Sequence, residues 1–240
     1  MTGRTPPRTV VVLAKEPVPG KVKTRLIGEL TAAEAAGLAR AALVDTLEAV
    51  DDLPGVHRVL ALDGRAGPWV PAGFAVIPQA TGGLDRRIAA AFDHVLGADG
   101  HPGPALLVGM DTPQLGPLLP AVDFEGYDAV LGLADDGGYW AVGLRRPDPA
   151  LFHGVPMSEA VTGRAQLERL RGAGLRVRLL PPLRDVDTVS DAAAVASAAP
   201  GTRFARAWSK VSHRVTSAAD VGAAPDIAAD LAGDVVGGQA

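Results

Sequence analysis

The residues with the clearest chemical meaning lie in one short loop near the start of the chain. Lysine occurs only at positions 15, 21, 23 and 210, so three of the four lysines fall within residues 14–26, together with Arg25. Lysine offers phosphate a point charge and arginine a bidentate fork, so we predict a diphosphate-binding loop that uses Lys15, Gly20, Lys23 and Arg25. The loop is not a Walker motif, because the Gly-Lys-Ser/Thr ending is absent. The alternative is chance clustering of lysines on a solvated loop.

Two aspartates follow predicted strands and suit a divalent cation. Asp111 lies in the Gly-Met-Asp-Thr-Pro segment 109–113, directly after the apolar run 105–108, and Asp187 lies in an Asp-Val-Asp-Thr segment after the last predicted strand. Carboxylates in such places can hold Mg²⁺ or Mn²⁺ that bridges substrate phosphates. The alternatives are that Asp111 caps the next turn, and that Asp187 or Ser190 caps the following helix.

A third acidic residue, Asp136, lies in the Asp-Asp-Gly-Gly segment 135–138 between two predicted strands. Glycines there allow a ligand to approach the backbone closely, which would place the ligand beside Asp136. The alternative is a plain hairpin turn. Trp140, just beyond it, is a candidate for lining a pocket.

Strand and helix patterns alternate around these residues. Residues 10–14 form a continuous apolar run, typical of a strand buried on both faces of a parallel sheet, and Thr31 with Glu34 forms a capping box. We predict an α/β fold with a mostly parallel central sheet, helices on both faces, and a ligand site at the carboxyl ends of the strands. The predicted strands are 9–14, 57–62, 74–77, 105–108, 127–133, 139–144 and 175–180, and the predicted helices are 31–50, 83–96, 163–171 and a short one from 190.

The pattern changes after residue 199. We predict one domain over residues 1–199, a C-terminal helix over 200–217 that contains Phe204 and Trp208, and a flexible tail over 218–240, where apolar periodicity is lost.

Composition narrows the function further. The 240 residues, 48% hydrophobic and 21% charged, suit one globular domain. A net charge of −4 without a basic stripe argues against nucleic acid. No apolar stretch approaches the ~20 residues that span a membrane, and none resembles a signal peptide, so we expect a cytoplasmic protein. The absence of cysteine excludes a thiolate metal site and a cysteine nucleophile.

Four motifs, taken in order, closely resemble a bacterial family of glycosyltransferases associated with radical-SAM and selenium-domain genes. They are Lys15-x-Pro-x-Pro-Gly-x-x-Lys23-Thr-Arg25-Leu, Gly109-x-Asp111-x-Pro113-x-Leu115, Asp136-Gly-Gly-Tyr139-x-x-x-Gly143-Leu144 and Asp185-x-Asp187-Thr188. The resemblance covers roughly residues 9–195. The family looks like the nucleotide-diphospho-sugar transferase superfamily, and it is more distantly similar to the molybdenum-cofactor and phospholactate guanylyltransferases.

This resemblance implies a GT-A (Rossmann-like) fold that binds a nucleoside diphosphate at the first loop. Asp111 would be the metal aspartate, and Gln79, Gly82 and Gly83 fall where nucleotidyltransferase relatives contact the base. The sequence departs from the family at two places, where Leu-Gly-Glu-Arg-Met is Leu-Asp-Arg-Arg-Ile over 84–88 and Pro-Trp-Ser-Thr is Pro-Met-Ser-Glu over 156–159. Both departures bear more on the acceptor side than on the donor side.

The expected function is therefore glycosyl transfer from a nucleotide-sugar to a small-molecule acceptor. Asp111 and Asp187 would hold Mg²⁺ or Mn²⁺, and Asp136 would orient the acceptor hydroxyl or take its proton, beside Gly137, Gly138 and Tyr139. One alternative is a guanylyl- or cytidylyltransferase-like enzyme that joins an NTP to a phosphate or phosphonate and releases pyrophosphate. Another is a non-catalytic nucleotide-binding module. A homodimer is left open.

Overall fold

The computed structural model describes residues 3–221, with side chains as far as position 213, and its centre is a seven-stranded sheet. The strand order is β3-β2-β1-β4-β6-β5-β7, and β6 runs antiparallel to its neighbours β4 and β5 while the other pairs are parallel. The strands are β1 (Thr9–Lys15), β2 (His57–Asp63), β3 (Phe74–Pro78), β4 (Ala105–Gly109), β5 (Ala129–Ala134), β6 (Tyr139–Leu144) and β7 (Val177–Leu183).

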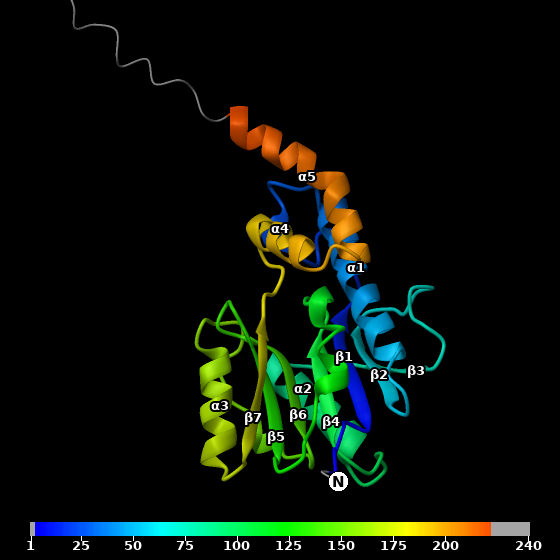
Figure 1. Cartoon of the computed structure of the whole chain (residues 1–240), viewed down its shortest axis with the longest axis vertical. Helices are drawn as coiled ribbons and strands as arrows, with labels where there is room; N and C mark the ends of the chain where they lie inside the picture. The colour runs from blue at the N-terminus through cyan, green and yellow to red at the C-terminus, as the bar shows by residue number, and fades with distance from the viewer. Residues whose placement is uncertain (1–2, 222–240) are drawn as a thin grey trace, which may run out of the picture.

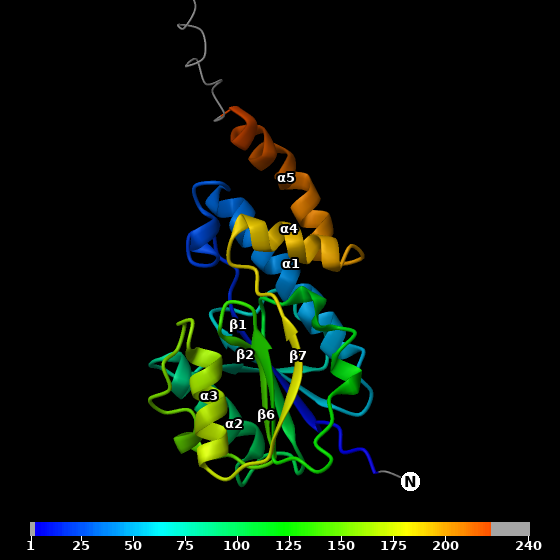
Figure 2. The ribbon, with the colours of Figure 1, turned by 60° about the vertical axis from the view of Figure 1, so that its left-hand side comes forward.

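Helices cover both faces of this sheet (Figures 1 and 2). Val10 and Val12 of β1 belong to the core under α1, whereas Val11 points into the opposite core with α2 and α3. The continuous apolar run is therefore explained by burial on two faces, and the predicted α/β class is confirmed. The helices are α1 (Ala32–Asp51), α2 (Leu84–Leu96), α3 (Thr162–Gly172), α4 (Val189–Ala198) and α5 (Arg203–Val221).

The capping box at the start of α1 is present as predicted. The Thr31 hydroxyl accepts from the Glu34 backbone N–H at 3.3 Å, and the Glu34 carboxylate accepts from the Thr31 N–H at 2.9 Å. Two N–H groups that α1 cannot bond internally are thus satisfied, which fixes where the helix begins after the lysine-bearing loop over residues 14–26, called the lysine loop below.

A third core lies beyond the carboxyl end of β7, where α4 and α5 pack beside α1 (Figures 1 and 2). Phe204 and Trp208 of α5 are buried in it together with Leu26, the last residue of the lysine loop, and Leu30. The C-terminal helices therefore hold the segment that carries Lys23 and Arg25.

The boundaries differ from prediction mainly at the C-terminal end. α5 continues to Val221, past the predicted end at 217, and the rest of the predicted tail, 222–240, lies outside the described residues. β7 runs on to Leu183 through Pro181 and Pro182, which its edge position tolerates because one side makes no ladder bonds.

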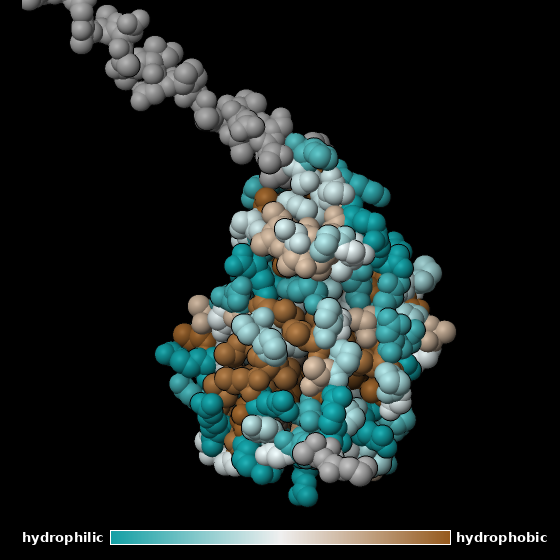
Figure 3. All heavy atoms as spheres, in the orientation of Figure 1, coloured by the Kyte–Doolittle hydropathy of each residue, from teal (hydrophilic) through white to brown (hydrophobic). Residues whose placement is uncertain are grey.

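Figure 3, in the same orientation as Figure 1, shows apolar surface over the region of the edge strand β7. Leu179 of this edge strand is 47% exposed. Over the described residues, no helix is long and apolar enough to cross a membrane.

Candidate functional site

A cavity of about 580 Å³ opens at the carboxyl ends of β1 and β4, a volume in the ordinary range for small-molecule sites. All four sequence motifs contribute to its wall, because the turn before β6 and the loop after β7 reach the same edge of the sheet. The predicted site residues in the lining are Lys15, Lys23, Arg25, Gln79, Asp111, Asp136, Gly138, Tyr139 and Asp187, and the lining also includes Lys21, Arg87, Trp140, Ser158, Glu159 and Asp185.

The lysine loop is anchored from its far end. Leu26 and Leu30 are buried against α1, α4 and α5, and a short 3-10 turn over Thr24–Leu26 follows Lys23. Lys23 itself has φ 48° and ψ 41°, a left-handed conformation that a residue with a Cβ adopts at some cost. Such backbone strain persists where the surrounding structure fixes it, and here it directs Lys23 into the cavity.

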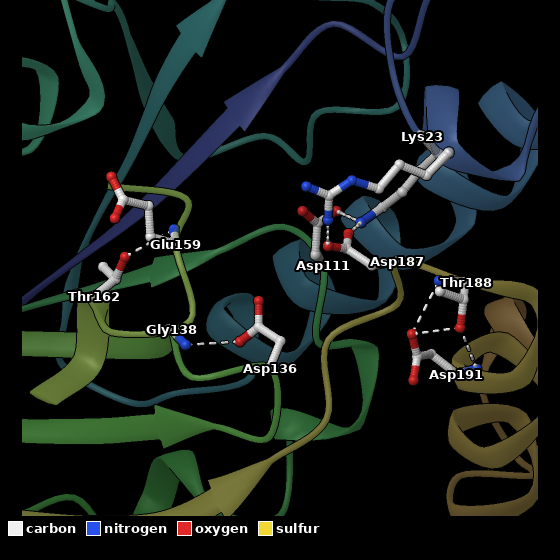
Figure 4. Close-up of polar contacts among 10 residues, drawn as sticks. Lys23, Asp111, Asp136, Gly138, Glu159, Thr162, Asp187, Thr188 and Asp191 are labelled. Atoms are coloured by element: carbon white, nitrogen blue, oxygen red, sulfur yellow. Dashed lines mark hydrogen bonds and ion pairs between the residues drawn. The ribbon is translucent and has the colours of Figure 1, made fainter. Parts of the chain in front are cut away.

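Lys23 joins two motifs that are far apart in the sequence. Its Nζ lies 2.9 Å from Asp111 Oδ1 and 3.3 Å from Asp187 Oδ1, and the carboxylates of both aspartates turn toward it (Figure 4). The Lys23 side chain is only 7% exposed. Burial by itself lowers the pKa of Lys23, but Asp111 and Asp187 outweigh it and raise that pKa above its ordinary value, so the ammonium stays charged.

Arg25 completes the cluster from the outer side. Its Nη1 lies 2.7 Å from Asp187 Oδ2, and its side chain is 69% exposed. Arg25 is thus paired with the carboxylate of a distant motif, that of Asp187. Two cations and two carboxylates, from Lys23, Arg25, Asp111 and Asp187, balance one another at the cavity wall.

Asp187 has no capping role in the structure. The N-cap of α4 is Thr188, which forms a capping box with Asp191: the Thr188 hydroxyl accepts from the Asp191 N–H at 3.2 Å, and the Asp191 carboxylate accepts from the Thr188 N–H at 2.9 Å (Figure 4). The alternative in which Asp187 or Ser190 caps this helix is therefore wrong, and the Asp187 side chain is available to the cavity.

Asp185 is a site residue whose role the sequence did not separate from that of Asp187. Its Oδ1 is shielded from solvent and has no hydrogen-bond partner among the described residues. Burial, with the nearby charges of Asp111 and Asp136, raises the pKa of Asp185 to about 7. The signal in the sequence was the pair of aspartates in the Asp-Val-Asp motif, of which Asp185 is the first, but nothing there shows which of the two is buried.

The turn before β6 is shaped by contact with another loop. Gly137 has φ 89°, and a Cβ at this position would lie 2.1 Å from the Ala160 carbonyl oxygen. The Gly163 N–H donates to the Gly137 carbonyl at 2.7 Å, which ties the turn to the start of α3. At Gly137, the segment that approaches the glycine backbone closely is therefore the loop before α3, where we had predicted a ligand. Gly138 lines the cavity.

Asp136 combines a turn contact with an open oxygen. Its Oδ1 accepts from the Gly138 N–H at 2.8 Å (Figure 4), while Oδ2 makes no hydrogen bond within the described part of the chain. Oδ1 of Asp136 therefore makes the turn contact that the hairpin-turn alternative predicts, whereas Oδ2 stays unpaired beside the cavity. Beside it, Trp140 is buried and donates from Nε1 to the Pro181 carbonyl at 3.1 Å.

Gln79 lines the cavity, and its side-chain amide is hydrogen-bonded within the protein. Its Nε2 donates to the carbonyls of Ala14 at 2.7 Å and Ala61 at 2.9 Å, and its Oε1 accepts from Arg87 at 3.3 Å. The cavity lining does not include Gly20, Gly82, Gly83 or Gly137. Contact of Gln79 and of these glycines with a ligand stays a prediction.

The donor set at the cavity suits a cation that arrives with phosphate. Within residues 3–221, no three or more acidic or histidine side chains are grouped so as to hold a metal ion by themselves. Asp111 and Asp187 are hard oxygen donors, and Mg²⁺ is commonly held by one or two carboxylates with substrate phosphates and water. The chemistry of these residues therefore fits Mg²⁺ or Mn²⁺ once phosphate oxygens are present.

Comparisons with known proteins agree with this fold. A family described as an uncharacterized protein conserved in bacteria (DUF2064) matches residues 46–159, which include Asp111 and Asp136 but neither Lys23 nor Asp187. No curated protein matches the chain. A structure from Desulfovibrio desulfuricans G20, of a protein proposed to be a nucleotide-diphospho-sugar transferase, superposes with a TM-score of 0.76 at 27% identity and covers 87% of this chain and 96% of that one.

Other solved structures are less similar. The inositol-1-phosphate CTP transferase of T. maritima has a TM-score of 0.49 at 13% identity, over 79% of this chain and 93% of that one. The 2-C-methyl-D-erythritol 4-phosphate cytidylyltransferase of Thermus thermophilus has a TM-score of 0.44 at 15% identity, over 86% and 99%. The chain has the fold of the nucleotide-diphospho-sugar transferases, and the family match and the Desulfovibrio structure support the resemblance to that superfamily. The association with radical-SAM and selenium-domain genes stays a prediction.

Proposed function

We propose that this protein transfers a glycosyl group from a nucleotide-sugar donor to a hydroxyl of a small-molecule acceptor. The observation that carries the proposal is a cluster of ion pairs at the carboxyl edge of the sheet, formed by Lys23 and Arg25 with Asp111 and Asp187. Cations for a diphosphate and carboxylates for its counter-ion lie on one cavity wall, where open α/β sheets bind their ligands. The class proposed for the Desulfovibrio protein adds support.

The donor diphosphate would lie against the lysine loop. Arg25 is exposed and can present two parallel N–H groups to phosphate oxygens, while the buried Lys23 supplies a point charge from the cavity wall. Lys15 and Lys21 are also exposed in the cavity lining and add positive charge at its mouth. The sugar would then extend toward the turn that carries Asp136.

Asp111 and Asp187 would hold Mg²⁺ or Mn²⁺ together with the donor phosphates. When bound, such an ion offsets the negative charge that develops on the departing diphosphate. Arg25 and Lys23 would contribute to the same stabilisation through charge-assisted hydrogen bonds.

Asp136 would act on the acceptor. The oxygen that the turn leaves open, Oδ2, would accept a hydrogen bond from the acceptor hydroxyl and take its proton as the hydroxyl oxygen attacks the sugar. The Gly138 N–H that binds Oδ1 would hold the carboxylate in this orientation.

A ligand screen followed by product analysis tests the proposal. Thermal-shift measurements with NTPs and nucleotide-sugars, each with Mg²⁺ or Mn²⁺, identify the donor, because a ligand that binds the folded state raises its apparent stability. Release of free nucleoside diphosphate from the stabilising nucleotide-sugar is the expected result. Release of pyrophosphate from an NTP, without nucleoside diphosphate, would contradict glycosyl transfer and indicate the nucleotidyltransferase alternative.

Variants at the turn separate an enzyme from a binding module. Asp136→Asn should keep donor binding and lose most of the turnover. Asp135→Asn is the matched control, since Asp135 is the adjacent exposed acid and pairs with Arg184 at 3.2 Å. Equal turnover in Asp136→Asn and the wild type would remove the role proposed for Asp136.

A further inference from the structure

We propose that Lys23 is a resident counter-ion that keeps a divalent cation away from Asp111 and Asp187 until a phosphate-bearing ligand draws its ammonium away. The inference rests on the proposed function for the nature of that ligand.

The contacts of Lys23 place its charge where a bound cation would lie. Its Nζ is within 3.3 Å of one oxygen from each aspartate, and the side chain is 7% exposed. Two carboxylates that converge repel each other, so a positive charge between them stabilises both in their ionised forms. The Lys23 ammonium supplies this charge from within the chain.

The position of Lys23 is built into the backbone. The residue is held at φ 48° by a loop whose next turn, Thr24–Leu26, is anchored through buried Leu26. A long, flexible lysine that met the carboxylates by chance would need no such constraint, because it could reach them from many backbone conformations. The anchored loop returns the ammonium to the same place each time.

A competition between cations follows. A divalent ion alone must displace a buried ammonium that has no other partner within the described residues, so its binding is weak. A diphosphate offers that ammonium new acceptor oxygens and at the same time completes the coordination of the ion. Metal and diphosphate should therefore bind cooperatively, each raising the affinity of the other by the same factor.

Titration with Mn²⁺ alone tests the inference without any nucleotide. Lys23→Met removes the charge and keeps a side chain of similar length at the left-handed position, so Mn²⁺ affinity should rise about tenfold or more, the factor that corresponds to losing one charge-assisted contact. Lys210→Met is the matched control, because Lys210 is an exposed lysine on α5 that does not line this cavity; its Mn²⁺ affinity should equal that of the wild type. Equal or lower affinity in Lys23→Met would overturn the proposal.

A second measurement uses the wild type and so does not depend on the variant folding. The chain has only four lysines, so side-chain ¹⁵N labelling of lysine gives few ammonium signals to assign. Mg²⁺ alone should leave the Lys23 signal in place, and Mg²⁺ with inorganic pyrophosphate should shift it. A shift of equal size with Mg²⁺ alone would contradict exclusion of the metal, and no shift with both would contradict release by phosphate. Neither experiment measures turnover, so failure here is distinct from failure of the proposed function.

Discussion

Arg25 Nη1 lies 2.7 Å from Asp187 Oδ2, although 162 residues separate the two in the sequence. One belongs to the motif that we assign to phosphate and the other to the motif that we assign to a metal ion. In the ligand-free site they neutralise each other. Because the Arg25 side chain is 69% exposed, this pairing is worth little by itself, and the guanidinium can exchange the carboxylate for phosphate.

Replacing Asp111 should remove the metal dependence of nucleotide binding. Asp111→Asn takes away one of the two charges that face Lys23, so we expect a lower melting temperature as well as a loss of about tenfold or more in nucleotide affinity measured with Mg²⁺. Calorimetry with and without EDTA measures the second effect. Asp51→Asn is the control, because it breaks an ion pair with Arg58 outside the cavity and should leave the metal dependence intact. Equal nucleotide affinity of the wild type in Mg²⁺ and in EDTA would contradict the metal role.

The raised pKa of Asp185 predicts a pH dependence of stability. Burial moves this pKa from 3.8 to about 7, so the folded state favours the protonated acid. The resulting contribution to stability is fully present below the unfolded value and is lost as the pH rises through about 7. Urea unfolding in EDTA should therefore show the free energy of unfolding of the wild type falling, relative to Asp185→Asn, between about pH 4 and pH 7. Parallel profiles for the two proteins would show that Asp185 is not perturbed.

Gly137 should not tolerate a side chain. Alanine there would need φ 89° and would place its Cβ 2.1 Å from the Ala160 carbonyl oxygen, so Gly137→Ala should destabilise the protein by about 1–3 kcal/mol. Gly172→Ala at the end of α3 is the matched control, since nothing lies within 4 Å of its added Cβ and its φ is not positive. This control should be neutral or stabilising by up to about 1 kcal/mol. Equal melting temperatures for the two variants would mean that the turn moves freely away from residue 160.

The sequence predicted the sheet and most helices because their signals are local. The run at 10–14 and the Thr31–Glu34 box both depend on neighbours in the chain, and the structure has them as predicted. The end of β7 was harder to predict, because Pro181 and Pro182 are unfavourable in a strand unless that strand lies at the edge of its sheet. Which strand lies at the edge depends on the order of the strands in the fold.

The candidate site was predicted as a set of residues but not as a set of contacts. Motif order brought Lys23, Asp111 and Asp187 together in one hypothesis, yet their pairing depends on the distance between two loops that only the fold determines. For the same reason Gly137 was assigned to a ligand and not to the chain, and Asp185 was not separated from Asp187. Burial of one carboxylate and not the other is a property of packing.

The preference of the site for a diphosphate over the bare nucleoside tests the central claim most directly. Calorimetric titration of both ligands, with Mg²⁺, into the wild type, Arg25→Ala and Arg25→Lys is the measurement, with Arg40→Ala on the exposed side of α1 as control. We predict that both Arg25 variants weaken diphosphate binding by roughly tenfold or more and leave nucleoside binding unchanged, because neither alanine nor a point charge replaces the planar fork. An unchanged preference in Arg25→Ala would contradict the phosphate-binding role of the loop, and with it the assignment of this site to a nucleotide-dependent transferase.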